Sequence, residues 1–173
     1  MSALIVTVLG LLSGVMLLFH LKKHPRSNQK NDLNISIVIP ARNEALRLPF
    51  LLESLKSSPH EVIVVDDESE DDTKQVALKY GVKVIHPKPR PEGIKGKPWA
   101  LLNGVKEAKE SVVLLLDADT TILPKGIERL ISIYLENETP LSIQPYHHMK
   151  KSYERLSVIF NLVVVMASNT YQM

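Results

Sequence analysis

Short apolar runs alternate along the chain with segments in which apolar residues recur every three to four positions. The runs lie at 35–39, 62–65, 82–85 and 112–116. In the last run no polar residue alternates with the apolar ones, which is typical of a strand covered on both faces by helices. Strands of this kind that alternate with helices predict an α/β fold with a mostly parallel sheet.

The helical spacing predicts four helices between and after these strands. One of them covers the segment 70–80 and ends at Gly81. The apolar residues expected to face inward in the other three are Leu48, Leu51, Leu52 and Leu55, with Pro49 in the first turn; Leu101, Leu102 and Val105, after Pro98; and Ile127, Leu130, Ile131 and Tyr134. A short additional strand is expected at 141–143. These elements together define a domain that begins at residue 35.

Residues 3–21 form an apolar segment without a formal charge. A helix over this range would be about 28 Å long, close to the hydrocarbon thickness of a bilayer. No basic residue precedes it and no convincing cleavage site follows it, which favours a retained anchor over a cleaved signal peptide. The bases that follow are Lys22, Lys23, Arg26 and Lys30. The positive-inside rule therefore predicts a single-pass protein of the cell membrane, with an anchor at 1–21, a basic polar tether at 22–34 and the remaining domain in the cytoplasm.

Acidic residues gather where two of the predicted strands end. Asp117 and Asp119 follow the run 112–116, and in an extended backbone they would project from the same face. Two carboxylates that close repel each other, and Mg²⁺ or Mn²⁺ relieves the repulsion while also binding the phosphates of a nucleotide. The carboxyl ends of parallel strands are also where ligands bind. The simpler alternative is a polar turn in which an aspartate caps the next helix.

The second acidic segment, Asp66 to Asp72, contains six acids among seven residues. We interpret Asp71 and Asp72 as the first-turn acids of the helix 70–80, with Ser69 as its N-cap, because negative charge suits the positive end of a helix dipole.

The segment 86–97 is rich in proline and glycine, which predicts a long loop. It carries Lys88, Arg90, Lys95 and Lys97 against one acid, Glu92. The loop is either a solvated surface segment or a lid that meets phosphate oxygens. Trp99, just after it, is interpreted as a packing residue rather than a substrate contact.

The amino-acid composition limits the number of domains and the classes of ligand and metal site that the chain can have. With 173 residues, 45% hydrophobic and 23% charged, the chain is expected to form one domain around one core. A net charge of +2, without a basic run interleaved with aromatics, argues against nucleic-acid binding. The absence of cysteine excludes disulfides and thiolate metal sites.

The last part of the sequence is the least regular. His147 and His148 are adjacent, so their side chains point in different directions and make a poor metal pair. The segment 158–167 is apolar but too short to span a membrane, and we expect a core or interfacial helix there. Because the chain stops at Met173 before a domain looks complete, we expect a fragment whose domain, 35–173, is incomplete at its C-terminus.

The order of motifs over residues 35–121 resembles that of family-2 glycosyltransferases. The matching motifs are Pro-x-x-Asn-Glu at Pro40 to Glu44, Asp-Asp-x-Ser at Asp66 to Ser69, Gly-Lys-x-x-Ala-Leu at Gly96 to Leu101, and Asp-x-Asp at Asp117 to Asp119. One departure is Glu68, where many members of the family have glycine; because it is a loop residue, we expect little effect.

The resemblance implies a GT-A fold, a nucleoside-diphosphate sugar as donor, and inverting transfer. Asp67, with Asp66 beside it, would contact the uracil or ribose, and Lys97 would approach the nucleotide or its diphosphate. The carboxylate of Asp117 would contact the ribose or the metal, and that of Asp119 the Mg²⁺ or Mn²⁺ bridging the two phosphates. The remaining residues expected at the nucleotide-sugar site are Pro40, Ala41, Asn43 and Glu44. A departing diphosphate gathers negative charge that a cation and a lysine can stabilise.

Within that family, the amino-terminal apolar segment, residues 141–147 and residues 159–162 are similar to the diaponeurosporenoate glycosyltransferases of bacterial carotenoid synthesis. This narrower resemblance implies UDP-glucose as donor and a lipid-soluble carotenoid acid as acceptor. Hopanoid and other lipid glycosyltransferases are close alternatives. In the family the general base lies downstream of the metal-binding aspartates, so we expect it beyond Met173, and we expect this chain to bind donor with little turnover.

Two other functions fit some of the same residues. The sequence from Asp117 to Thr121 also matches the Asp-x-Asp-x-Thr pattern of haloacid-dehalogenase-type phosphatases, in which the first aspartate is a nucleophile. Those enzymes carry this strand at the start of their core, whereas here several strand–helix units precede it. A membrane-tethered nucleotide-sugar-binding protein without turnover is the non-enzymatic alternative.

Overall fold

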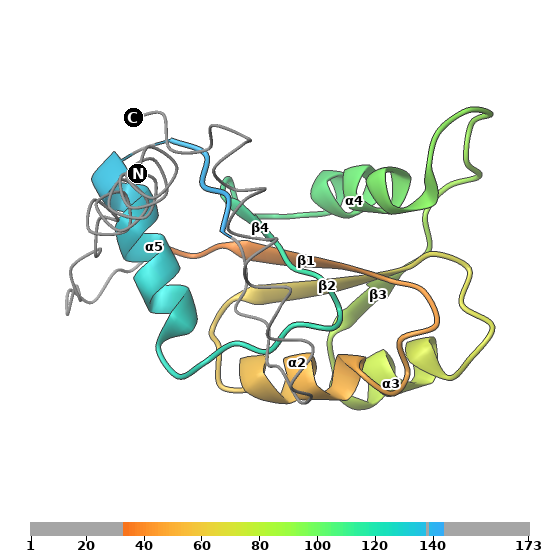
Figure 1. The fold of residues 1–173 in the computed structure, drawn as a ribbon, viewed down its shortest axis with the longest axis horizontal. Coiled ribbons are helices and arrows are strands. Elements are labelled where there is room, and N and C mark those ends of the chain that lie inside the picture. The colour runs from red at the N-terminus through yellow and green to blue at the C-terminus, as the bar shows by residue number, and fades with distance from the viewer. Residues whose placement is uncertain (1–32, 138, 144–173) are drawn as a thin grey trace, which may run out of the picture. The chain divides into compact units, whose positions relative to one another are not determined.

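The computed structural model describes residues 33–137 and 139–143 (Figure 1). The predicted anchor, the part of the tether before residue 33, the histidine pair and the apolar segment 158–167 lie outside these residues. Within the described part of the chain, no helix is both long and apolar enough to cross a membrane. The chain divides into two compact units, Met1–Pro140 and Leu141–Met173, and the fold below is that of the first.

The described elements alternate between strands and helices, as the sequence predicts. They are β1 (Ser36–Ala41), α2 (Leu48–Leu55), β2 (Glu61–Asp66), α3 (Thr73–Lys79), β3 (Lys83–Ile85), α4 (Gly96–Lys106), β4 (Val113–Leu115) and α5 (Gly126–Asn137). The strands form one parallel sheet in the order β3-β2-β1-β4. The α/β class and the parallel sheet are confirmed. The strand expected at 141–143 is wrong, because this short apolar segment forms no strand and exposes Leu141 and Ile143.

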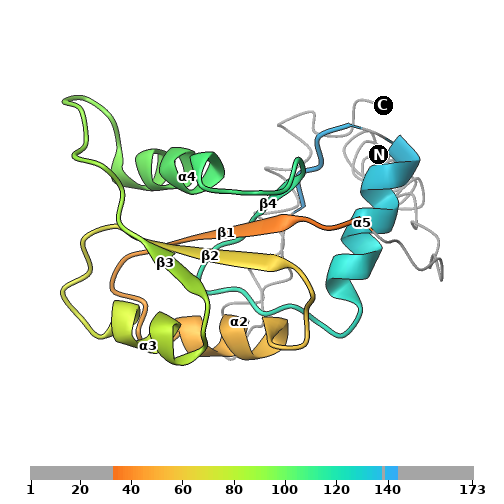
Figure 2. The same cartoon turned by 180° about the vertical axis from the view of Figure 1, so that it is seen from behind.

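The chain reverses its direction across the sheet after β3. It runs from β1 through β2 to β3, and then returns to place β4 on the other side of β1. Right-handed crossovers in opposite directions require helices on opposite faces. The helices α2 and α3 accordingly cover one face and α4 covers the other (Figures 1 and 2). The reversal creates a topological switch point between β1 and β4, which is where open α/β sheets bind ligands.

The sheet is buried on both of its faces at β1. Ile37 and Ile39 belong to the apolar cluster on the side of α2, whereas Val38 packs with Ile63 and Val65 on the side of α4. All of these side chains are fully buried. Burial of each such side chain stabilises the fold by about 1.5–3 kcal/mol, which explains a strand whose two faces are both apolar.

The predicted inward faces of α2 and α5 are largely confirmed. The four leucines of the α2 stripe are at most 4% exposed, and Pro49 lies in the first turn of the helix. In α5, Ile127 and Ile131 join the same cluster as the α2 leucines. Proline fits the first turn because the amide hydrogen it lacks has no helical partner there.

The predicted inward face of α4 is wrong for two of its three residues. Leu102 and Val105 are 45% and 41% exposed, whereas Ala100 and Gly104 are buried. A Cβ atom on Gly104 would lie 2.3 Å from Cγ1 of Val38 and would overlap it. Small residues thus let α4 approach the sheet closely, and this close packing decides which side of the helix faces inward.

The strand predicted to be covered on both faces, β4, lies at an edge of the described sheet. It is also shorter than predicted, and Leu115 is 49% exposed. The central positions belong to β1 and β2 instead. An apolar run indicates that a strand can be buried, but the order of strands depends on the crossovers.

The loop before α3 is longer than predicted. The helix begins at Thr73 rather than at 70, and its N-cap residue is Asp72, whose side chain makes no capping hydrogen bond. Ser69 is therefore not the N-cap.

Glu68, in the same loop, has a φ angle of 58°, in the left-handed region. This conformation costs an ordinary residue about 1–2 kcal/mol and costs glycine little, which gives a physical reason for glycine at this position in related sequences.

We expect the substitution Glu68→Gly to raise the free energy of unfolding of the full chain by about 1 kcal/mol, because it removes the left-handed strain. Urea denaturation measures the change. The matched control is Glu92→Gly, since Glu92 is an exposed turn residue without a positive φ angle. It should leave stability unchanged or lower it. Equal effects of the two substitutions would contradict the strain at Glu68.

Candidate functional site

The carboxyl ends of all four parallel strands lie at one edge of the sheet, and the predicted site residues follow them there. The loop after β1 carries Asn43 and Glu44, the loop after β2 begins with Asp67, and the segment after β4 carries Asp117. The helix α4 begins at this same edge with Gly96, because it runs back from β3 to the start of β4. The fold therefore brings the four motifs together.

The loops after β1 and β2 are joined by hydrogen bonds. The backbone N–H of Asn43 donates to Oγ of Ser69 at 3.0 Å, and its side-chain oxygen accepts from the N–H of Glu70 at 2.8 Å. The N–H of Glu44 donates to the hydroxyl of Thr73 at 2.8 Å. Asn43 has a φ angle of 55°, a conformation that asparagine tolerates better than most residues. The Asn-Glu motif thus holds two loops together at the edge.

Asp71 completes this connection between the loops. Its carboxylate accepts from the N–H of Ala45 at 3.0 Å, from the N–H of Thr73 at 3.0 Å, and from the Thr73 hydroxyl. The hydrogen bond from that hydroxyl is the largest cause that lowers the pKa of Asp71; desolvation opposes it, and the hydrogen bonds from the backbone lower the pKa further. Asp71 therefore precedes the helix and links loops far apart in sequence, a role that its sequence neighbours alone do not reveal.

The two adjacent aspartates after β2 have different surroundings. Oδ1 of Asp66 accepts from the N–H of Ser69 at 3.2 Å, and Oδ2 lies 3.5 Å from Nδ1 of His86. The N–H of Asp67 donates to the carbonyl of Ala41 at 2.9 Å, which fixes its backbone. Asp67 as a residue is only 8% exposed, yet its carboxylate makes no hydrogen bond or ion pair with another described residue. Asp66 thus supports the loop, whereas Asp67 is available to a ligand.

The carboxylate of Asp67 faces the start of α4. A Cβ atom on Gly96 would lie 2.5 Å from Oδ2 of Asp67 and 2.8 Å from Nη1 of Arg90. Only glycine fits there without moving these groups. The partial positive charge of a helix N-terminus offsets part of the cost of burying a carboxylate. The glycine of the predicted motif therefore makes room for Asp67 beside the helix.

Lys97 and Asp117 form a direct ion pair. Nζ of Lys97 donates to Oδ1 of Asp117 at 2.6 Å. Both side chains are more than half exposed, at 58% and 56%. Lys97 lies in the first turn of α4 rather than in the preceding loop, which ends before Gly96. Two predicted ligand-binding residues are thus each other's partner in this structure.

Asp117 and Asp119 do not continue an extended strand as expected. The N–H and the hydroxyl of Thr120 both donate to the carbonyl of Asp117, at 3.1 and 2.7 Å, so the chain turns after β4. Ala118, between the aspartates, is 5% exposed and packs into the core, whereas Asp117 and Asp119 are exposed. The extended backbone expected for the two carboxylates is therefore wrong, and a turn with a buried alanine presents both of them to solvent.

The two aspartates fit a particular kind of metal site. The described residues contain no group of three or more His, Cys, Asp or Glu side chains that could hold a metal ion. Mg²⁺ is commonly bound by one or two carboxylates together with substrate phosphates and water. Asp117 and Asp119 offer that donor set, so a metal at this turn would also need the phosphates of a ligand.

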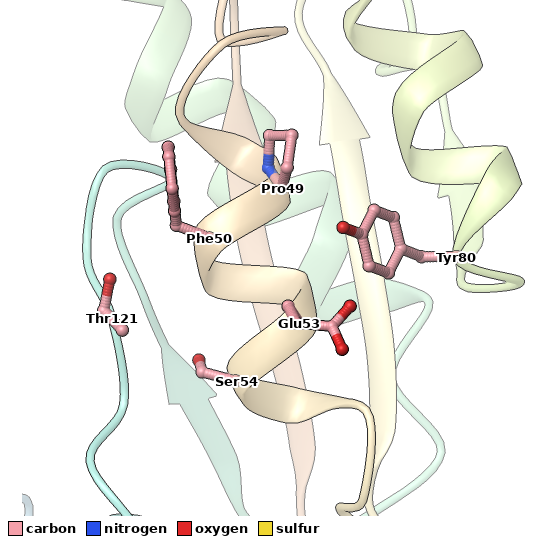
Figure 3. A pocket seen from close by; sticks show the side chains of 6 residues that line it. All are labelled: Pro49, Phe50, Glu53, Ser54, Tyr80 and Thr121. Atoms are coloured by element: carbon pink, nitrogen blue, oxygen red, sulfur yellow. The ribbon is translucent and has the colours of Figure 1, made fainter.

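Two cavities lie away from this edge. One, of about 500 Å³, lies along the outer side of α2 and is lined by Pro49, Phe50, Glu53, Ser54, Tyr80 and Thr121 (Figure 3). Phe50 points from α2 toward the segment of Thr121, and Glu53 lies on the side of Tyr80. None of the predicted site residues lines this cavity. The candidate site is therefore the open carboxyl edge of the sheet, not the larger cavity.

The second cavity, of about 210 Å³, lies at the opposite, amino-terminal edge of the sheet. Its lining includes Ser58, His60 and Gly81, from the segments that precede β2 and β3. Burial lowers the pKa of His60, against the opposing charges of Glu128 and Glu110. His60 Nδ1 is buried without a hydrogen-bond partner among the described residues. Because Nδ1 of His60 is not exposed, this atom offers no hydrogen bond to a ligand in the cavity.

The chain matches a known protein family and curated proteins. The family model described as "Glycosyl transferase family 2" matches residues 36–161. Over 147 residues the chain is 41% identical to 4,4'-diaponeurosporenoate glycosyltransferase from Staphylococcus aureus (strain bovine RF122 / ET3-1). The match covers 82% of this chain and 39% of the relative. The chain thus spans about two fifths of the length of the curated relatives it matches.

Solved structures show the same fold. Glucosyl-3-phosphoglycerate synthase from Mycobacterium tuberculosis, in complex with Mn²⁺, UDP and glucosyl-3-phosphoglycerate, aligns with a TM-score of 0.56 and 26% identity over 67% of this chain and 47% of that one. TarS 1-349 from S. aureus, in complex with UDP, aligns with a TM-score of 0.51 and 26% identity over 69% of this chain and 40% of that one. Together with the family match over most of the described sheet and its loops, these similarities show that the chain belongs to glycosyl transferase family 2.

Proposed function

We propose that this chain is the donor-binding part of a glycosyltransferase that moves a sugar from a UDP-sugar, with glucose the favoured sugar, onto a lipid-type acceptor with inversion. The observation that carries the proposal is the carboxylate of Asp67, a residue that is only 8% exposed. It has no protein partner in the described structure and lies beside the start of α4, at the edge where Lys97 and Asp117 meet. A carboxylate with so little access to water is costly to leave without hydrogen-bond donors, and a ligand with such donors would satisfy it.

The relatives support the choice of donor and acceptor. The M. tuberculosis structure is a complex with UDP and Mn²⁺, and the TarS structure is a complex with UDP. The S. aureus relative is named for 4,4'-diaponeurosporenoate, a carotenoid acid. By analogy, this chain would take a UDP-sugar and Mg²⁺ or Mn²⁺, and a carotenoid acid is the acceptor we favour.

Each residue at the edge has a distinct role in this proposal. Asp67 accepts hydrogen bonds from the nucleoside, and Asp66 keeps the loop that carries it in place. Lys97 neutralises the diphosphate that leaves, and Asp117 and Asp119 hold the metal. A bound divalent cation would stabilise the charge that develops on the leaving diphosphate. The strand-end residues Pro40, Ala41, Asn43 and Glu44 line the nucleotide-sugar side of the site.

The remaining parts of the proposal concern the segments outside the described residues. The apolar segment 3–21 and the bases that follow it support a single-pass protein of the cell membrane whose catalytic domain is cytoplasmic. A membrane location would suit a lipid-soluble acceptor. None of the residues at this edge is assigned as the general base. The phosphatase alternative is not retained, because the family match covers Asp117 and its strand.

The metal role of Asp119 predicts a specific loss on substitution. Asp119→Asn should abolish the part of UDP binding that depends on Mn²⁺, because an amide is a much weaker ligand than a carboxylate, while the fold stays intact. Isothermal titration of the full chain with UDP, with and without Mn²⁺, measures this. Asp72→Asn, the same change at another exposed aspartate, is the control and should leave both affinities unchanged. Retention of the full Mn²⁺ effect in Asp119→Asn would exclude this role.

The nucleoside role of Asp67 predicts that UDP and uridine lose affinity together. Asp67→Ala should weaken both by a similar factor, about 5- to 150-fold, because one hydrogen bond to a polar ligand contributes about 1–3 kcal/mol. Competition between uridine and UDP on the full chain provides the two affinities, and Asp72→Ala serves as the control. If uridine binds the variant as well as it binds the parent, Asp67 does not contact the nucleoside.

A further inference from the structure

The ion pair between Lys97 and Asp117 joins two groups that the donor site needs separately. Asp117 belongs to the turn that offers two carboxylates to a metal, and Lys97 lies in the first turn of α4, beside Gly96. Nζ of Lys97 is 2.6 Å from Oδ1 of Asp117. In this structure, therefore, the Lys97 ammonium group, which the proposed function assigns to the diphosphate, contacts a carboxylate oxygen that a metal would use.

A metal ion and the Lys97 ammonium could not share Asp117 without cost. A metal binds a carboxylate oxygen at about 2.0–2.1 Å, which would bring it within about 5 Å of the ammonium group. Two like charges at that distance repel each other even in water. Binding of a metal to Asp117 thus favours release of Lys97, and the Lys97–Asp117 pair disfavours the metal.

The exposure of the pair makes such an exchange feasible. Both side chains are more than half exposed, and ion pairs of this kind contribute little net stability. A lysine side chain is long and flexible, so its ammonium group can move without a change in α4. A diphosphate, with its negative charge, is a stronger partner for Lys97 than a single exposed carboxylate.

We propose that Lys97 is a positioning residue that couples the two ligands of the site: it neutralises Asp117 when the donor is absent, and it moves to the diphosphate and releases Asp117 to the metal when the donor binds. This inference rests on the proposed function. It predicts that UDP and the metal each strengthen the binding of the other beyond their direct contact, because such coupling is reciprocal.

The first test measures Mn²⁺ binding to the full chain without nucleotide, by the electron paramagnetic resonance signal of free Mn²⁺. Lys97→Met should bind Mn²⁺ about three- to tenfold more tightly than the parent chain, because the competing ammonium is gone. The matched control is Lys95→Met, since Lys95 is an exposed lysine of the same segment without an ion pair among the described residues. It should change Mn²⁺ affinity less than twofold. Equal affinity of Lys97→Met and the parent chain would overturn the proposal.

The second test measures UDP binding in the presence of a chelator, where no metal takes part. Asp117→Asn should bind UDP about three- to tenfold more tightly than the parent, because Lys97 is then free for the diphosphate. The loss of a negative charge alone could have the same sign, so the comparison is repeated in a Lys97→Met background. There the gain should vanish. An equal gain in both backgrounds would show a simple charge effect and overturn the proposal.

These outcomes separate this inference from the proposed function. If the parent chain binds neither UDP nor UDP with Mn²⁺, the donor-binding function itself is wrong. If UDP binds but Mn²⁺ binds no variant, with or without UDP, Asp117 holds no metal and the coupling by Lys97 is overturned with it. If UDP and Mn²⁺ both bind and the two Lys97 tests fail, the function stands and only the coupling is wrong.

Discussion

Pairing of β1 with a parallel strand on each side is the constraint on which the rest of the structure depends. The six residues of β1 align with β2, and the first three of them also align with β4. With helices on both faces of the sheet, β1 is buried between two apolar layers, and its direction fixes the edge at which the loops that follow the strands leave. The switch point beside it brings the segment after β4 next to the loop after β1. The site is thus a consequence of strand order rather than of any single motif.

The acids at this edge divide into those that hold the loops and those that remain available. Asp66 and Asp71 use their oxygens to accept hydrogen bonds from neighbouring loop residues. Asp67 and Asp119 make no such bonds with described residues, and Asp117 is held only by an exposed ion pair. Removal of a loop-holding acid should therefore disturb the position of the others, whereas removal of an available acid should affect the ligand alone. This division connects the stability of the loops to the chemistry of the site.

Much of the fold could be predicted from the sequence, because the leucine stripe of α2 and the apolar strands depend on local spacing. The inward face of α4 could not, because close packing at Gly104 outweighs the larger apolar side chains of the helix. The motifs identified the residues of the site, but the turn after Asp117 and the hydrogen bond that Asp71 accepts from the N–H of Ala45 depend on tertiary contacts. Hydrogen bonds between distant loops leave no periodic pattern in a sequence.

Hydrogen–deuterium exchange of the full chain, with and without UDP and Mn²⁺, tests most directly whether the carboxyl edge of the sheet is the donor site. We expect slower exchange in the loops after β1, β2 and β4 and in the first turn of α4, because a ligand there covers and stabilises them. The segments before β2 and β3, which border the cavity of about 210 Å³ at the opposite edge, should be unchanged. Protection at that opposite edge, with none at the carboxyl ends of the strands, would contradict this account.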